Sequence, residues 1–468
     1  MMREYDVIVV GAGPAGIFAA LELVRENELN VLILEGGADI ERRTCPARVS
    51  ARDCTVCRTC SITSGWGGAG AFSDGKLTLC QKIGGWLDEY IDSDTLNGLI
   101  DHVDKIYLEF GAPADLYGTA EEEIDRIRKE AIMADLTLID CRIRHMGTDR
   151  CADVLGSMRD YIDRRATIKT GVHVSTILTD EKAVAGVRTD NGEDYFSRNV
   201  IIAPGRHGSD WLSQEAKRIG LSQLYNSVDI GVRVEVPKEV MRPLTDTLYE
   251  SKLIYYSKSF QDEVRTFCMN PGGFVAPETY GDVVLVNGHS FSHNKSENTN
   301  FALLVSTSFT EPFKEPTAYG KYIARLANLL GNGIIIQSLG DLYLGRRSTA
   351  ERIERSTVKP TYGAANPGDL SFVLPYRYIK GVIEMLEALD KLAPGVNSRN
   401  TLLYGVEAKF YSSRMKLTGG FETEVRNLYA IGDGAGITRG LVQSSCSGVV
   451  AARSILAKSN GLEKKRAS

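Results

Sequence analysis

The sequence predicts an α/β fold in which a parallel sheet with flanking helices is built from discontinuous segments and is interrupted by an inserted α+β domain. Three observations predict this fold. A glycine-rich turn at residues 11–16 follows an apolar run near the N-terminus, a second at residues 432–436 follows an apolar run near the C-terminus, and the long stretch between them contains alternating patterns. Glycine turns directly after buried strands are typical of nucleotide-binding sheets. The wide separation of the two turns predicts that both ends of the chain belong to one domain.

The composition is that of an ordinary globular protein. The chain has 468 residues, 43% hydrophobic and 25% charged, enough for two or more domains. Its formal net charge of -5 argues against a nucleic-acid-binding surface. No run approaches the roughly 20 apolar residues that span a bilayer, and the N-terminus enters a strand almost at once. We therefore expect no nucleic-acid or membrane partner, no signal peptide and a cytoplasmic location.

The N-terminal unit reads as strand, turn, helix and strand, with an acid at the end of the second strand. Gly11 permits the tight turn, Gly13 lets the backbone approach a pyrophosphate, and Gly16 lets helix and strand pack closely. The helix start offers free N–H groups to phosphates, and Glu35 can accept hydrogen bonds from ribose hydroxyls. The residues predicted to line this cradle are Gly11, Gly13, Pro14, Ala15, Gly16 and Glu35.

The C-terminal unit is a short buried strand that ends in Gly432-Asp433-Gly434, followed by a helix rich in small residues. Asp433 can hydrogen-bond a flexible polyol, and the helix start can direct N–H groups at a phosphate or a flavin ring edge. The arrangement resembles the ribityl-binding motif of the FAD-dependent oxidoreductases with the glutathione-reductase-type, Rossmann-like fold. The resemblance implies FAD, held by Gly432, Asp433, Gly440, Leu441 and Val442.

A third element is a strand that runs into Ala203-Pro204-Gly205. It resembles the Ala-Thr-Gly motif of the same superfamily, with Pro204 in place of the Thr, so Ala203 and Gly205 are expected near the cofactor. A three-strand meander precedes it, as is typical of that fold. The resemblance implies that Val172 or Val174 offers backbone atoms to the adenine.

The most distinctive segment is Gly67-Gly68-Ala69-Gly70-Ala71-Phe72-Ser73-Asp74-Gly75-Lys76-Leu77. Together with residues 11–16, 266–273 and 432–440, it resembles the family of FAD-dependent dehydrogenases, over almost the whole chain. A glycine cluster of this kind lets the backbone lie against a flat ring or a phosphate. Lys76 near a flavin would stabilise the reduced, anionic ring; a surface lysine is the alternative. The expected contacts are Gly67, Gly68, Ala69, Phe72, Ser73 and Lys76.

Four of the nine cysteines crowd one short segment, at Cys45, Cys54, Cys57 and Cys60. Two consecutive two-residue spacers resemble the run that ligates a [4Fe–4S] cluster. A four-thiolate zinc site, a redox dithiol that relays electrons to the flavin, and unliganded thiols are the alternatives. Because this segment lies just before the glycine cluster, residues 45–80 form one cysteine-rich and glycine-rich stretch that is expected to face the flavin.

The domain organisation follows from these motifs. Residues 1–227 and 400–468 are predicted to form the FAD-binding domain, and residues 228–399 an inserted substrate-binding cap with antiparallel strands and two long helices. No second strand-and-glycine-turn unit for NAD(P)H occurs in the middle of the chain. Electrons would therefore come from nicotinamide bound transiently, from a redox protein or from the substrate itself.

Residues 268–273 and 287–290 are predicted to form the floor of the cap. His289 could protonate a substrate after hydride transfer; a hydrogen-bonded turn residue is the alternative, and Cys268 is expected to be a packing residue. We expect an FAD-dependent oxidoreductase that transfers hydride between flavin N5 and a small organic substrate by reduction or desaturation of a C–C or C–N bond. The alternative is an electron carrier or redox sensor centred on the cysteines.

Overall fold

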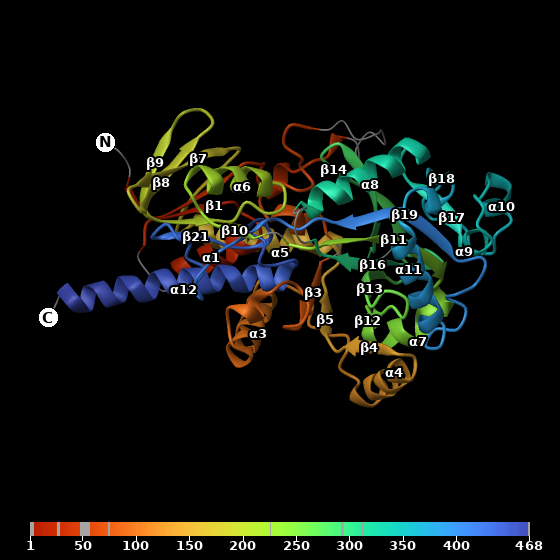
Figure 1. Ribbon diagram of the computed structural model, residues 1–468. Coiled ribbons are helices and arrows are strands. Elements are labelled where there is room, and N and C mark those ends of the chain that lie inside the picture. The colour runs from red at the N-terminus through yellow and green to blue at the C-terminus, as the bar shows by residue number, and fades with distance from the viewer. Residues whose placement is uncertain are drawn as a thin grey trace. The chain divides into compact units, whose positions relative to one another are not determined.

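The computed structural model describes residues 4–25, 29–46, 57–73, 75–224, 226–291, 294–309, 313 and 315–466. The chain divides into two compact units (Figure 1). The first unit comprises Met1–Ala114, Arg144–Asn226 and Ser412–Ser468, and the second comprises Asp115–Ile143 and Ser227–Tyr411. In the described part of the chain, every helix is too short or too polar to cross a lipid bilayer.

The first unit is built on a mixed sheet with the strand order β6-β2-β1-β9-β8-β7, in which β21 also pairs with β9. β6, β2, β1, β9 and β21 are parallel to one another, whereas β7, β8 and β9 form the expected antiparallel meander. β2 is buried along its whole length, as a parallel strand covered on both faces must be. The strands are β1 (Glu4–Val10), β2 (Val31–Glu35), β6 (Thr167–Thr170), β7 (Val174–Asp180), β8 (Ala183–Thr189), β9 (Asp194–Ile202) and β21 (Leu428–Ala430).

Two helices from opposite ends of the chain pack together in this unit. α1 (Pro14–Val24) contacts α12 (Leu441–Arg466) so closely that a Cβ on Gly448 would lie 2.1 Å from the carbonyl oxygen of Ala15. The remaining helical segments are η1 (Ile40–Arg42), η2 (Gly68–Phe72), η3 (Leu87–Glu89), α3 (Ser93–Glu109), α5 (Thr148–Asp163), α6 (Ser209–Arg218) and η5 (Asp433–Ala435). The short strands are β3 (Lys76–Leu79), β5 (Arg142–His145), β10 (Gln223–Leu224) and β20 (Arg414–Met415).

The second unit contains a largely antiparallel sheet with the order β18-β17-β19-β11-β16-β13-β12-β4, and a separate β14–β15 hairpin. Its strands are β4 (Leu136–Ile139), β11 (Val228–Pro237), β12 (Lys252–Tyr256), β13 (Glu263–Asn270), β14 (Phe274–Tyr280), β15 (Val283–His289), β16 (Asn298–Thr307), β17 (Ile335–Ser338), β18 (Asn366–Pro367) and β19 (Leu402–Lys409). Its helices are α4 (Glu121–Met133), α7 (Lys238–Leu248), α8 (Pro316–Gly331), α9 (Leu339–Tyr343), α10 (Ala350–Glu354), η4 (Leu370–Phe372) and α11 (Tyr376–Leu389).

The two faces of this sheet differ in chemistry. Val228, Ile230, Val232, Val234 and Val236 alternate along β11 and join the main apolar core with residues of α8 and α11. The intervening positions of β11 include buried charged residues, which belong to the polar cluster described below. The mixed architecture, a Rossmann-like sheet with an inserted domain, confirms the predicted fold class.

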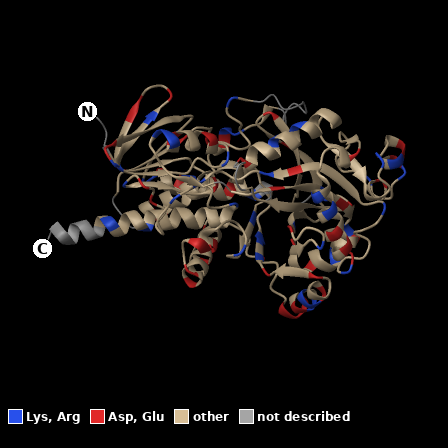
Figure 2. Ribbon diagram, viewed as in Figure 1, with Lys and Arg blue, Asp and Glu red and all other residues tan. Residues whose placement is uncertain are grey.

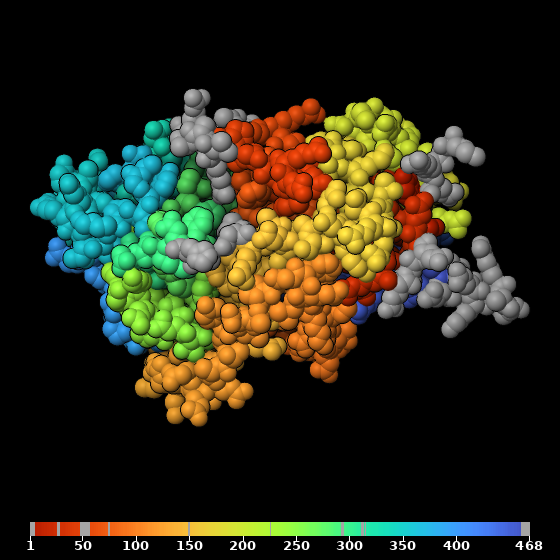
Figure 3. All heavy atoms as spheres, turned by 180° about the vertical axis from the view of Figure 1, so that it is seen from behind, coloured from red at the N-terminus to blue at the C-terminus, as the bar shows by residue number. Residues whose placement is uncertain are grey.

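The second unit is larger than the predicted cap of residues 228–399. Residues 115–143 join it because β4 pairs with β12, and it continues to Tyr411 because β19 pairs with β11. α4 also packs on α7, and Figure 3 shows the orange α4 against the yellow-green α7. α4 carries both acidic and basic residues (Figure 2), and Arg126 forms ion pairs with Glu123 and Glu130.

Candidate functional site

The carboxyl ends of four parallel strands of the first unit lie at one edge of its sheet. Val10 of β1 lies opposite both Leu34 of β2 and Ile202 of β9, and Ala430 of β21 also lies opposite Ile202. The residues that follow are Gly11, Glu35, Ala203 and Ile431. Ligands of open α/β sheets bind at this edge. The structure therefore brings the N-terminal and C-terminal glycine turns to the same place.

Close backbone approaches at this edge require glycine. Gly11 has φ +100°, and a Cβ there would lie 2.1 Å from the carbonyl oxygen of Ala203. Gly432 has φ +73°, and a Cβ there would lie 2.9 Å from the Cβ of Ala15 at the start of α1. The second turn thus lies directly against the first helix. Any side chain at Gly11 or Gly432 would push these segments apart.

The N-terminus of α1 fits a phosphate. Gly13 is its N-cap, no side chain caps the helix, and the first turn carries no acid. The first N–H groups of a helix need partners from outside the helix, and a phosphate is a suitable one. A Cβ built on Gly13 would meet nothing nearer than the Cα of Gly68, at 3.9 Å. The bare backbone at Gly13 therefore leaves the space that the pyrophosphate of a dinucleotide would need.

Glu35 has a wider role than the predicted ribose contact. Its carboxylate accepts hydrogen bonds from the backbone N–H groups of Ala12 at 2.7 Å, and of Gly37 and Gly65 at 2.8 Å. An ionised carboxylate has about four acceptor sites, so about one is left for a ribose hydroxyl. Glu35 ties the first glycine turn to the segment that leads into the distinctive glycine cluster.

The glycine cluster lies on the first turn. The N–H of Gly67 donates to the carbonyl of Ala12 at 2.7 Å, and a Cβ on Gly68 would lie 3.0 Å from the Cα of Gly13. η2 then carries Ala69 and ends at Phe72, and the Ser73 hydroxyl donates to the carbonyl of Gly70 at 2.9 Å. Lys76 opens β3 and is half-buried. The cluster is therefore positioned by main-chain contacts beside the start of α1.

Arg43 also lies beside the glycine cluster, and the sequence motifs did not predict a role for it. Its guanidinium donates to the carbonyls of Ser61 at 3.0 Å, Ile62 at 2.9 Å and Trp66 at 2.6 Å, and lies 4.9 Å from the centre of the Phe72 ring. Burial lowers the pKa of Arg43 to about 10, against the opposing effect of Glu35 and Cys60. Nothing in the local sequence marks this role, since the three acceptors are main-chain atoms.

The cysteine segment is only partly described, because Cys54 lies outside the described residues. Cys45 and Cys60 are half-buried and are not in a disulfide, and Cys57 is exposed. No group of three or more metal-ligating side chains occurs among the described residues. The segment is held beside the meander, where Thr59 Oγ1 lies 3.1 Å from His173 Nε2.

The predicted adenine contacts lie next to Glu35. The N–H of Val172 donates to the main-chain carbonyl of Glu35 at 2.9 Å, so this N–H already has a partner within the chain. Val174 begins β7 and lies opposite Thr189 of β8. Val172 is thus placed beside the acid that the sequence predicted to bind the ribose, with its N–H already engaged, and Val174 follows two residues later at the start of the meander.

The C-terminal turn places Asp433 at the same edge. Its carboxylate accepts a hydrogen bond from the Thr438 hydroxyl at 2.7 Å and lies 3.9 Å from Nε of Arg206. Burial raises the pKa of Asp433, against the effect of Arg206. A Cβ on Gly440 would meet nothing nearer than the Cα of Gly84, at 3.9 Å. α12 begins at Leu441, with Val442 in its first turn, so a second helix start follows the turn.

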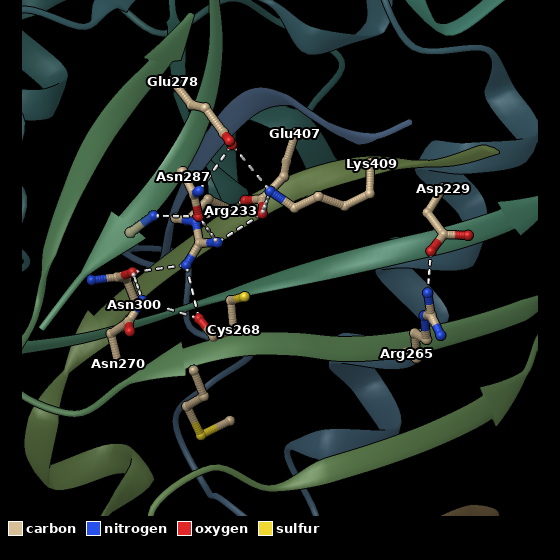
Figure 4. Close-up of polar contacts among 12 residues, drawn as sticks. Asp229, Arg233, Arg265, Cys268, Asn270, Glu278, Asn287, Asn300, Glu407 and Lys409 are labelled. Atoms are coloured by element: carbon tan, nitrogen blue, oxygen red, sulfur yellow. Dashed lines mark hydrogen bonds and ion pairs between the residues drawn. The ribbon is translucent and has the colours of Figure 1, made fainter. Parts of the chain in front are cut away.

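The second unit contains a buried polar cluster around Arg233 (Figure 4). Arg233 is fully buried and makes two hydrogen bonds of 2.7 Å to the carboxylate of Glu407. It also donates to the main-chain carbonyl of Cys268 at 3.0 Å and to Oδ1 of Asn300 at 2.9 Å. Cys268 has φ +43°, a conformation uncommon for a residue other than glycine. The cluster thus fixes the backbone of the 266–273 motif.

Lys409 extends this cluster. Its amine lies 3.2 Å from Glu407 and 3.4 Å from Glu278, which also accepts a hydrogen bond from Asn287 at 2.9 Å. Burial lowers the pKa of Lys409, but the two carboxylates outweigh that effect and raise it above its usual value. His289 lies at the end of β15 opposite Phe274 and is half-buried. The strand pattern predicted the sheet but not the buried charges on its polar face.

Comparison with known proteins agrees with the motif assignments. Residues 227–410 match the family described as FAD-dependent protein, C-terminal domain-like. An uncharacterized protein of Clostridium beijerinckii is 28% identical over 474 residues, covering 96% of this chain and 80% of the relative.

Three solved structures are similar at low identity. Formate oxidase of Aspergillus oryzae is 12% identical with a TM-score of 0.45, and the match covers 98% of this chain and 99% of that one. L-proline dehydrogenase of P. horikoshii is 11% identical with a TM-score of 0.44, and the match covers 98% of this chain and 95% of that one. Glycine oxidase of Geobacillus kaustophilus is 14% identical with a TM-score of 0.40, and the match covers 97% of this chain and 95% of that one. The family match agrees with the resemblance expected from the motifs, of which residues 266–273 lie within the matched range: residues 227–410 are similar to the FAD-dependent proteins with this C-terminal domain.

Proposed function

We propose that this protein is an FAD-dependent oxidoreductase that exchanges hydride with a small organic substrate. The observation that carries the proposal is the convergence of both glycine turns on one sheet edge, beside a helix start with no side-chain cap. The family match over residues 227–410 supports the choice of FAD. When bound, FAD supplies a ring that accepts and returns hydride.

Different residues of this sheet edge would bind the successive parts of FAD, from the pyrophosphate and the ribose to the ribityl chain and the flavin ring. The first turn of α1 would bind the pyrophosphate, and the remaining acceptor of Glu35 would bind the ribose. Asp433 would bind the ribityl chain, and the start of α12 would direct N–H groups toward the flavin. The glycine cluster, through Lys76, would place a cation near the ring and favour its reduced form.

The second unit would hold the substrate, as the cap does in the resembling family. His289 would hold or deliver a proton for the substrate atom that receives or loses hydride. The substrate bond would be C–C or C–N. We also propose an external electron donor, either NAD(P)H or a redox protein, and a cytoplasmic location.

The cysteine segment supports a separate proposal, in which an Fe–S cluster or a dithiol feeds electrons to the flavin and the protein acts as a carrier or sensor. Zinc, which has no redox chemistry, would only hold the thiolates together. Iron, sulfide and zinc analysis of anaerobically purified protein tests it. Metal bound in proportion to protein, and lost in Cys57→Ala and Cys60→Ala, would favour this role. Metal-free protein with full flavin reduction in both variants would exclude it.

The proposed cofactor is tested by the absorption spectrum of purified protein and of Gly13→Val. The wild type should show flavin bands near roughly 370 and 450 nm. Gly13→Val should lose them but keep its fold, because Gly13 has extended backbone and its Cβ position has no neighbour nearer than 3.9 Å.

The matched control is Gly98→Val in α3, where an added Cβ meets no atom within 4 Å. It should retain the bands. A colourless wild-type protein that cannot be reconstituted with FAD would contradict the proposal, and so would equal flavin content in both variants.

A further inference from the structure

α8 of the second unit is apolar on two faces. Its inner face is buried in the core through Pro316, Gly320, Ile323, Ala324, Ala327 and Gly331. Its outer face carries large apolar side chains with high exposed fractions, which we name the outer stripe: Tyr322 70%, Leu326 39%, Leu329 78% and Leu330 54%. A surface helix of a globular protein normally carries polar or charged side chains opposite its buried face. The outer stripe therefore calls for a covering surface.

The outer stripe is long enough to serve as the centre of an interface. α8 has 16 residues, or about 24 Å of helix, and the stripe occupies its second half and part of its first. Contiguous apolar patches of a few hundred Å² mark interaction sites on soluble proteins. Single exposed apolar residues need no explanation, whereas these four lie on one face of one helix.

The charges beside the stripe have both signs. Lys321 and Arg325 lie on α8, Glu315 directly precedes it, and Asp282 lies 2.8 Å from Arg325. Two cations offset by two acids give no net attraction to an anionic lipid surface, and the chain as a whole carries a formal charge of -5. A surface with both signs around an apolar centre is instead complementary to a second copy of itself.

The spacing of the stripe fits a two-fold axis. Tyr322, Leu326 and Leu330 follow one another at intervals of four residues, so Leu326 is the centre of a ridge. Two such ridges interdigitate in the commonest class of helix packing. In an antiparallel pair about an axis at Leu326, Tyr322 of one copy would face Leu330 of the other, as an isologous interface requires.

We propose that the outer stripe of α8 is the contact surface for a second copy of this chain, with Leu326 on the two-fold axis. The proposal does not depend on the cofactor. It is tested by sedimentation equilibrium of the full-length protein as purified. The wild type should be a dimer, and Leu326→Glu should weaken dimerisation by about 30-fold or more, as for a central interface residue.

The matched control is Met133→Glu on α4, at a residue that is 78% exposed and lies outside the stripe. It should remain dimeric. The circular dichroism spectrum of both variants should match that of the wild type, since both side chains are already partly in water. A monomeric wild type, or a dimer that Leu326→Glu leaves intact, would overturn the proposal.

The position of the axis is tested by Leu326→Cys. A residue on a two-fold axis meets its own copy, so this variant should form a disulfide-linked dimer on oxidation, in excess of any formed by the wild type. Met133→Cys should not. Flotation with vesicles of phosphatidylglycerol and phosphatidylcholine that is lost in Leu326→Glu would assign the stripe to lipid and overturn the proposal.

Discussion

At the scale of single residues, Arg43 shows how one side chain can order a segment built mainly from glycine and small residues. Its guanidinium holds the three carbonyls of Ser61, Ile62 and Trp66 inside the protein. These atoms belong to the segment that leads into the glycine cluster, and Gly65 in the same segment donates to Glu35. Arg43 therefore positions the backbone beside the nucleotide edge without being a predicted ligand itself.

We predict that Arg43→Met lowers the free energy of unfolding by about 3 kcal/mol, because one buried and two partly buried carbonyls lose their donor. Urea denaturation measures this change. Arg42→Met is the matched control, since Arg42 is exposed, and should stay within about 0.5 kcal/mol of the wild type. Equal stability of the two variants would show that the Arg43 hydrogen bonds contribute nothing.

Glu235 is a buried acid of β11 that accepts hydrogen bonds from the hydroxyls of Tyr404 and Thr361, each at 2.5 Å. Burial raises the pKa of Glu235, and these hydrogen bonds oppose the effect only in part. The folded state thus holds the proton more tightly than the unfolded state. The stability that protonated Glu235 contributes is fully present below the pKa of about 4.3 that this group has in the unfolded state. That stability is lost as the pH rises through the higher pKa of Glu235 in the folded state.

Glutamine cannot ionise, so Glu235→Gln should not lose stability through this group when the pH rises. We predict that the variant becomes more stable relative to the wild type as the pH rises from about 4 to 8. Melting temperatures across that range measure the difference. Glu354→Gln, at an exposed residue, should show a constant offset from the wild type. A constant offset for Glu235→Gln as well would contradict the assignment.

At the scale of elements, the Arg233–Glu407 pair joins β11 to β19 and also holds the bulged end of β13. Both side chains are fully buried. A buried ion pair adds little net stability over an apolar pair, but removing one partner leaves an uncompensated charge. The main effect of the pair is therefore to hold Arg233 where it fixes the backbone conformation of Cys268, and its net contribution to the stability of the sheet is small.

We predict that Glu407→Leu lowers the free energy of unfolding by about 3–5 kcal/mol, whereas the double variant Arg233→Met with Glu407→Leu recovers most of that loss. A double-mutant cycle by chemical denaturation measures the coupling. Asp246→Asn breaks an exposed pair with Arg242 and should cost less than about 1 kcal/mol. Additive effects at Arg233 and Glu407 would contradict the account.

At the scale of the whole molecule, the predictable features are local and the unpredictable ones are long-range. The strands and turns at Gly11 and Gly432 follow from apolar runs and glycine spacing, so the fold class and the shared sheet edge could be predicted. Residues 115–143 belong to the second unit because β4 pairs with β12, and no local sequence pattern predicts this pairing. The roles of Arg43 and Arg233 likewise depend on carbonyl oxygens brought in from distant segments.

The central claim is that both ends of the chain hold one nucleotide, with Gly13 at its phosphates and Asp433 on its flavin side. The measurement that tests it most directly is calorimetric titration of FAD and of ADP, which carries only the adenosine and phosphates, into flavin-free protein with Asp433→Ala. Asp210→Ala, at an exposed acid of α6, is the control. We predict that Asp433→Ala weakens FAD binding about tenfold or more, a loss of one hydrogen bond, and leaves ADP binding unchanged. Equal losses for both ligands, or none for FAD, would contradict the claim.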